Sequence, residues 1–174
     1  MKRTLLIFSL LIPILATAQN YRIEFKSPTI DSQKKYYLGQ HYRDTFVVRD
    51  SATAGNQTLV FSGQVSLETG VYTLLDDSKK KIFDFMVDDS RKFSISFDDK
   101  HTNAGMKVTG SKANTAMFQY MAKLDWANEQ SKAITEKRKD PATKEQADKE
   151  MDQLSKTMKS FEEEYLKNNK QYRF

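Results

Sequence analysis

The sequence contains no cysteine among its 174 residues, and only two histidines, three prolines and six glycines. Without cysteine the chain cannot form disulfides, thiolate zinc sites or iron–sulfur clusters, and it has no cysteine nucleophile. Two histidines leave little room for a histidine-rich metal site. The chain nevertheless holds 11 Phe, 8 Tyr and 39% hydrophobic residues, too many for a disordered polypeptide. The composition therefore indicates a folded protein without redox chemistry of its own.

Residues 1–18 have the layout of a cleaved secretory signal peptide. Lys2 and Arg3 precede an apolar run over residues 5–15, and the small residues of Ala16-Thr17-Ala18 follow it. The run is too short to cross a bilayer of about 30 Å as a helix, which favours cleavage over a retained anchor. We expect an exported, periplasmic protein that starts near Gln19 and has no membrane anchor.

The charge of the mature chain is close to balanced. Removing Lys2 and Arg3 from the 28 basic residues leaves 26, against 23 acidic ones. The basic run Lys79-Lys80-Lys81 follows two aspartates closely and is typical of a solvated turn. Nucleic-acid binding needs a clustered basic face, so we expect no nucleic-acid partner.

Residues 19–110 show hydrophobic alternation with a period of two. Tyr21, Ile23 and Phe25, for example, alternate with charged residues. This period predicts strands with one buried face. Eight segments separated by turn-forming residues share it: 21–25, 36–42, 45–49, 58–62, 71–75, 82–87, 93–97 and 106–109. We expect an antiparallel β-sandwich or open barrel of about eight strands.

Residues 111–174 are predicted to form an antiparallel helical hairpin, which gives the chain an α+β fold. Ser111 or Asn114 is expected to cap the first helix, and Asp140-Pro141 to start the second. Apolar residues of the second helix recur at spacings of four and three, which is typical of a helix-packing seam. They are Ala147, Met151, Leu154, Met158, Phe161 and Tyr165.

The sequence shows no recognisable catalytic constellation. His41 lies in an aromatic strand and His101 in a polar loop, so they do not suggest a metal or acid–base pair. The pairs Asp88-Asp89 and Asp98-Asp99 leave a calcium site as an alternative, but they lack the regular spacing of a dedicated calcium loop. We therefore predict no catalytic residue, no cofactor and no metal, and expect the chain not to be an enzyme.

Two groups of residues are predicted to form an interaction surface. Tyrosine presents a rigid, amphipathic area that suits protein interfaces, and apolar seams can bind partner helices. The alternative for the seam is that it only packs on the first helix, since a hairpin needs such a seam to form. The candidates are Tyr36, Tyr37, Tyr42, Met151, Leu154, Met158 and Phe161.

Short motifs follow one another in order along the mature chain. Among them are Tyr21-Arg22-Ile23-Glu24-Phe25, Tyr37-Leu38-Gly39, Phe61-Ser62-Gly63, Gly70-Val71-Tyr72 and Phe93-Ser94-Ile95. The most specific is a strand ending in Val108-Thr109-Gly110-Ser111, with Asn114 and Phe118 behind it. In this order the sequence resembles the N-terminal domain of unknown function that precedes a thioredoxin-like domain in exported thiol–disulfide interchange proteins of Gram-negative bacteria.

The resemblance implies a β-sandwich, a long charged helical pair and then a redox domain. The sequence has no Cys-x-x-Cys, so thiol exchange is not assigned to it. We expect either a fragment of a longer oxidoreductase or a stand-alone remnant. Its expected role is that of a non-catalytic accessory module, which contacts a thioredoxin-like domain in cis or trans or associates with itself.

Two further function classes stay open from the sequence. One is a periplasmic holdase-like chaperone, in which a β body oligomerises and paired helices protrude to hold clients. The other is a carbohydrate-binding sandwich, which would carry exposed aromatic rings as a flat platform.

Overall fold

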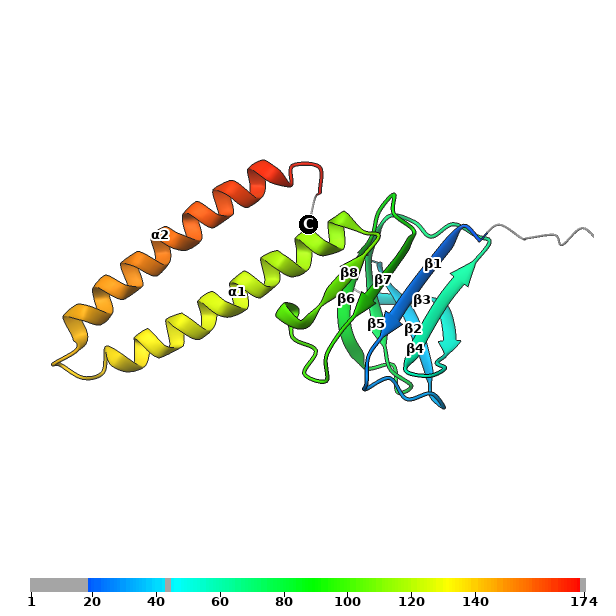
Figure 1. The fold of residues 1–174 in the computed structure, drawn as a ribbon, viewed down its shortest axis with the longest axis horizontal. Coiled ribbons are helices and arrows are strands. Elements are labelled where there is room, and N and C mark those ends of the chain that lie inside the picture. The colour runs from blue at the N-terminus through cyan, green and yellow to red at the C-terminus, as the bar shows by residue number, and fades with distance from the viewer. Residues whose placement is uncertain (1–18, 43–44, 173–174) are drawn as a thin grey trace, which may run out of the picture.

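The computed structural model describes residues 19–42 and 45–172, which form a β-sandwich followed by a helical hairpin (Figure 1). The predicted signal peptide, residues 1–18, lies outside the described residues. The strands are β1 (Tyr21–Lys26), β2 (Lys35–Tyr42), β3 (Thr45–Thr53), β4 (Thr58–Gly63), β5 (Gly70–Leu75), β6 (Lys81–Val87), β7 (Lys92–Ser96) and β8 (Lys107–Thr109). A short 3₁₀ turn, η1 (Asn103–Gly105), precedes β8, and the helices are α1 (Lys112–Lys137) and α2 (Lys144–Asn168).

The strands form two separate four-stranded sheets, so the architecture is the sandwich rather than the barrel. One sheet has the order β4-β1-β7-β8 and the other the order β3-β2-β5-β6. The predicted alternation is confirmed in β1, where Tyr21, Ile23 and Phe25 are buried and the residues between them are not. One pairing differs from the prediction: β1 and β7 run parallel, with Ile23 opposite Phe93.

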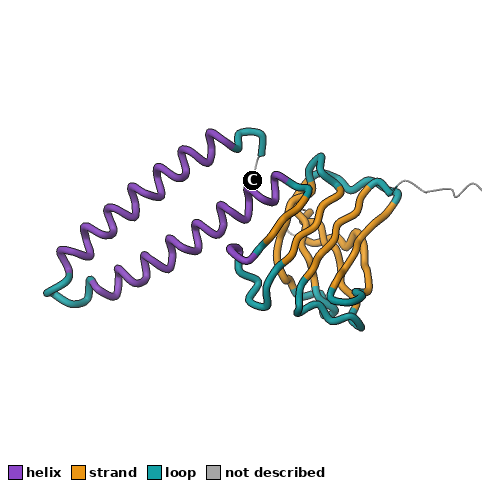
Figure 2. The backbone as a smooth tube through the Cα atoms, in the orientation of Figure 1, coloured by secondary structure: helices purple, strands orange, loops and turns teal. Residues whose placement is uncertain are grey.

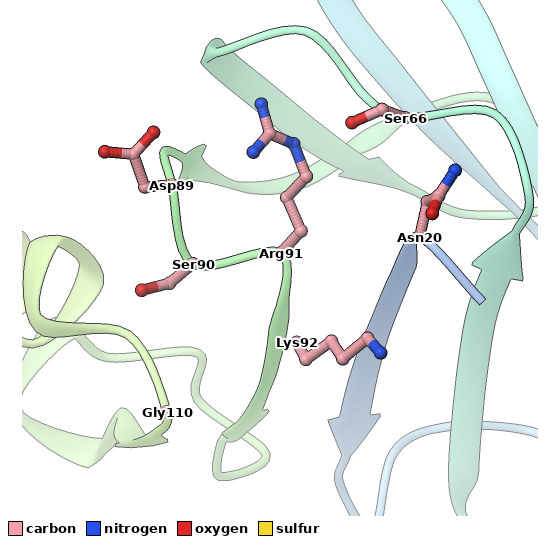
Figure 3. A pocket seen from close by; sticks show the side chains of 7 residues that line it. All are labelled: Asn20, Ser66, Asp89, Ser90, Arg91, Lys92 and Gly110. Carbon is pink, nitrogen blue, oxygen red and sulfur yellow. The ribbon is translucent and has the colours of Figure 1, made fainter. Parts of the chain in front are cut away.

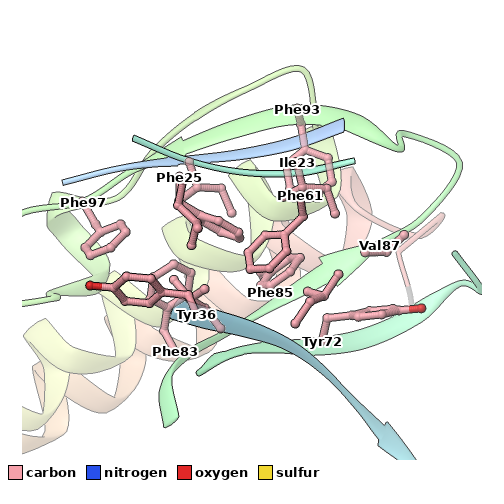
Figure 4. Packing of buried hydrophobic residues seen from close by; sticks show 14 of the residues in the cluster. Ile23, Phe25, Tyr36, Phe61, Tyr72, Phe83, Phe85, Val87, Phe93 and Phe97 are labelled. Atoms are coloured by element: carbon pink, nitrogen blue, oxygen red, sulfur yellow. The ribbon is translucent and has the colours of Figure 1, made fainter. Parts of the chain in front are cut away.

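Phenylalanine dominates the core between the sheets (Figure 4). Phe25 of β1 is fully buried, and its ring meets those of Phe61, Phe83 and Phe85 edge-on at centroid distances of 5.2 to 6.0 Å. Edge-to-face contact is the favoured arrangement of aromatic rings, because it places the positive ring edge against the negative face. The core therefore consists of interlocked rings contributed by both sheets.

The helical hairpin projects from one side of the sandwich (Figure 2). At 26 residues and 1.5 Å per residue, α1 is about 39 Å long. Only its first part lies against the strands β6 and β8, while α2 packs on α1. The predicted start of the second helix at Asp140 is wrong by a few residues. The Asp140 carboxylate instead accepts a hydrogen bond from the Ala142 amide within a turn, and α2 begins at Lys144.

A compact hydrogen-bonded joint attaches α1 to the sandwich. Ser111 caps the helix as predicted, and its hydroxyl accepts from the Asn114 amide at 3.2 Å. The fully buried Asn114 side chain accepts from the Met86 amide and donates to the Met86 carbonyl, both at 2.7 Å. Asn114 thereby pairs with main-chain groups at the free edge of β6, as a neighbouring strand would.

The residue before the cap has to be glycine. Gly110 has a φ of +88°, a region that side chains other than glycine rarely adopt. A Cβ atom there would lie 2.8 Å from the carbonyl oxygen of Lys92. The sharp turn from β8 into α1 therefore depends on Gly110, and the turn sets where the hairpin leaves the sandwich.

Candidate functional site

The predicted seam of α2 is largely used within the hairpin. Met151, Leu154, Met158 and Phe161 are all half-buried on the side that faces α1. Near the base of the hairpin, Phe161 stacks on Tyr120 of α1 with ring centroids 5.9 Å apart. The seam therefore packs on the first helix, and its role in binding another protein stays a prediction.

Ion pairs close the far end of the hairpin. Lys137 Nζ lies 2.8 Å from a carboxylate oxygen of Glu150, and Arg138 Nε lies 2.7 Å from one of Asp148. All four side chains are partly exposed, so each pair contributes little to stability, about 0–1 kcal/mol. The packed seam, rather than these exposed pairs, therefore contributes most to the stability of the hairpin.

The three predicted tyrosines do not share a surface. Tyr36 is only 5% exposed and points into the core, where its hydroxyl accepts from the Asp31 amide. Tyr37 lies on the opposite face of the sheet beneath the ammonium groups of Lys35 and Lys79. Tyr42 is 55% exposed, at the end of β2. The strand period of two separates Tyr36 from Tyr37, so Tyr36 is not available for an interaction surface.

The structure brings His41 into a hydrogen-bonded cluster on the outer face of the β3-β2-β5-β6 sheet. The Thr73 hydroxyl donates to Asp84 Oδ1 at 2.6 Å, and His41 Nε2 lies 3.0 Å from Thr73 Oγ1. A hydroxyl has one proton, so Thr73 accepts from His41 and the His41 Nε2 atom carries a hydrogen. Nε2 then has no lone pair with which to activate the hydroxyl.

Sequence reasoning missed this cluster because its members are distant along the chain. His41 lies on β2, Thr73 on β5 and Asp84 on β6, and only the strand registers bring them together. The available signal was the alternation, which places all three on the face of their strands that points away from the core.

Exposed apolar side chains surround His41 on this face. Phe46 is 51% exposed, Val48 44% and Val71 40%, and the Phe46 ring meets the His41 ring at 4.6 Å. We call His41, Phe46, Val48 and Val71 the sheet-face patch. Beside it, β3 pairs only with β2 among the described strands, so its outer edge offers unpaired main-chain groups. The patch and the edge together have the features of a protein-contact surface.

The Asp84 carboxylate is held in its charged form. Burial raises the pKa of Asp84, but hydrogen bonds from Lys81, Thr73 and His41 outweigh burial and bring the pKa below its ordinary value. A carboxylate whose pKa is lower in the folded than in the unfolded chain stabilises the fold above about pH 4, and this contribution disappears as the pH falls through the folded pKa.

We therefore expect the Asp84→Asn variant to lose less stability on acidification than the parent chain. The measurement is urea unfolding between about pH 6 and pH 2.5, within which an unperturbed aspartate titrates. Asp99→Asn is the control, because Asp99 is exposed. Parallel pH profiles for the parent and the Asp84 variant would show that the network does not hold the charge.

The paired aspartates act within turns rather than converging on a site. Asp88 accepts from the Ser90 amide, and Asp98 accepts from the Lys100 and Thr102 amides. Among the described residues no group of three or more His, Asp or Glu side chains is placed to hold a metal ion. In the same part of the chain no helix is long and apolar enough to span a membrane.

Comparison with known proteins identifies a family for the chain but no curated relative. None of the curated proteins matches the chain. Residues 21–117 match a family described as a domain of unknown function, DUF4369. The matched range covers every described strand and the joint at Asn114, and it ends within α1. Because this range is more than half of the sequence, the chain belongs to the DUF4369 family.

Proposed function

We propose that the chain is a non-catalytic accessory module of an exported, periplasmic thioredoxin-like thiol–disulfide oxidoreductase. It would supply protein contacts or dimerisation, and a thioredoxin-like domain would carry the cysteines. The resemblance in motif order suggests the thioredoxin-like partner. Membership of the DUF4369 family agrees with the expected N-terminal domain of unknown function. The observation that carries the contact role is the sheet-face patch, where three large apolar side chains are at least 40% exposed beside an open strand edge.

The test measures direct binding between the purified chain and a purified thioredoxin-like oxidoreductase from the periplasm of the same organism. We expect a dissociation constant of about 1–10 μM by calorimetry, and a loss of at least roughly tenfold on Phe46→Ser, because this exposed ring would be buried in the complex. Leu166→Ser is the matched control, since Leu166 is an exposed apolar side chain of α2 outside the sheet-face patch.

Two outcomes would count against this function. Absence of binding at about 100 μM would remove the oxidoreductase as partner. An equal loss of affinity in the Phe46 and Leu166 variants would show that the contact does not lie in the sheet-face patch. If the chain self-associates through the patch, light scattering shows a dimer that Phe46→Ser dissociates.

The projecting hairpin favours a second candidate, the holdase-like chaperone. A β body that carries protruding paired helices is the arrangement expected of that class, and the hairpin extends away from both sheets (Figure 1). Light scattering distinguishes the two candidates. A trimer or larger assembly that also slows aggregation of an unfolded client favours the chaperone, whereas a monomer or dimer without that effect excludes it.

A further inference from the structure

A cavity of about 520 Å³ opens at one end of the sandwich. Its walls come from β1, β3, β4, β5 and the segment that joins β4 to β5. The polar side chains that reach it include Tyr21, Arg49, Asp50, Glu68 and Tyr72. Its volume lies within the range of small-molecule sites, about 300–1,000 Å³.

A β-bulge aims two consecutive charged residues into this cavity. In the pairing of β2 with β3, Leu38 lies opposite Asp50 and Gly39 lies opposite Val48, so Arg49 is the extra residue. In a regular strand Arg49 and Asp50 would point to opposite faces, but the extra residue lets both side chains line the cavity. Bulges of this kind commonly redirect side chains at functional sites.

The cavity walls are held in position by hydrogen bonds. The Tyr21 hydroxyl donates to Asp50 Oδ2 at 2.6 Å, Arg49 Nε donates to Gln40 Oε1 at 2.7 Å, and the Tyr72 hydroxyl donates to the Glu68 carbonyl at 2.9 Å. Burial and the neighbouring Asp50 raise the pKa of Tyr21, so its hydroxyl stays neutral. The Tyr21 ring lies across Gly63, where a Cβ atom would come within 2.7 Å of it.

These bonds leave both donors and acceptors free to meet a ligand. Gln40 does not engage the two terminal amino groups of Arg49, and only one of them forms an ion pair, at 3.7 Å, with Glu68 Oε2. Asp50 Oδ1 accepts from the Ser51 amide at 2.7 Å and Oδ2 from Tyr21, and each carboxylate oxygen keeps a further lone pair. The cavity thus presents a donor next to acceptors on neighbouring residues of one strand.

The charges around the cavity balance. Arg91 of the adjoining shallow pocket extends toward the segment that carries Ser66, and its Nε donates to the Leu67 carbonyl (Figure 3). Arg49 and Arg91 thus offset Asp50 and Glu68. A charged ligand would gain little net attraction in such a field, whereas an uncharged one with hydroxyl groups can bond to both the carboxylate and the guanidinium.

We propose that this cavity binds a small uncharged carbohydrate through the side chains of Arg49 and Asp50. Adjacent sugar hydroxyls donate to Asp50 and accept from Arg49, while the buried Tyr21 and Tyr72 rings form the floor beneath them. The site is a cavity walled by strands of both sheets, unlike a flat platform of exposed aromatic rings. It is separate from the sheet-face patch, so it does not depend on the accessory function.

The test is a titration of the isotope-labelled chain with glucose, galactose, mannose and N-acetylglucosamine, followed by NMR. We expect saturable shifts of the Gly63, Ser66 and Tyr72 amides with a dissociation constant of about 1 mM for at least one sugar. Asp50→Asn and Arg49→Gln should each weaken binding by roughly fivefold or more, because each removes a charge-assisted hydrogen bond. Asp99→Asn should leave the affinity unchanged.

Each other outcome overturns the proposal. These are the absence of saturable shifts up to about 10 mM of all four sugars, shifts confined to residues outside the cavity, or equal affinity in the parent and the Arg49 variant. Arg49 is exposed, so its variant is expected to fold even if Asp50→Asn does not. Circular dichroism establishes whether each variant is folded.

Discussion

Replacing Asn114 by alanine is expected to lower the free energy of unfolding by about 2–4 kcal/mol. The change removes both hydrogen bonds to Met86 and leaves its buried amide and carbonyl without the side-chain partner. Each unsatisfied buried group costs about 1–3 kcal/mol, which is large against a total stability of about 5–15 kcal/mol. Urea unfolding measures the loss, and hydrogen exchange should show faster exchange of the Met86 amide.

Asn128→Ala is the matched control, because Asn128 is an exposed asparagine on the same helix. Its effect should stay within about 0.5 kcal/mol of zero. If the two variants were equally stable, Asn114 would not be what joins α1 to the edge of β6.

Replacing Phe25 by alanine is expected to cost about 3–5 kcal/mol. Phe25 is fully buried, and its ring contacts Phe61 of its own sheet as well as Phe83 and Phe85 of the opposite sheet. Truncation removes these contacts and leaves a cavity that rigid neighbouring rings fill poorly. Thermal and urea unfolding both report the loss.

Phe46→Ala is the control for Phe25→Ala, because it makes the same substitution at a surface position. Phe46 is half exposed, so its variant should lose well under about 1 kcal/mol. A small effect at Phe25 would mean that the sheets repack around the missing ring. It would contradict the prediction that the Phe25 ring is essential to the core.

The local pattern of the sequence predicted the elements well but not how they pair. Alternation located all eight strands, although β3 and β8 contain no buried residue. The parallel neighbours β1 and β7 are separated in the chain by five other strands. A pattern that specifies only which face of a strand is buried cannot identify such a distant neighbour. The pairing of Ile23 with Phe93 therefore comes from tertiary packing.

The candidate sites were harder to predict than the fold for the same reason. The sheet-face patch requires the registers of three strands, and the cavity requires a bulge at Arg49 that no residue type announces. Asn114 was expected only as a helix cap, whereas its side chain completes a sheet edge 28 residues away in sequence. Single-strand patterns contain no information on such cross-strand contacts.

The joint at Gly110, Ser111 and Asn114 gives the hairpin the mechanics of a lever. Besides this joint, the Asp125 carboxylate in the middle of α1 accepts from Asn103 Nδ2 at 2.8 Å, so the arm is the part of α1 beyond Asp125, about 18 Å long. Tilting this part by about 10° would displace its tip by about 3 Å. A change in the angle between the sandwich and this part of the hairpin would therefore displace the loop at Asp140 more than any other part of the hairpin.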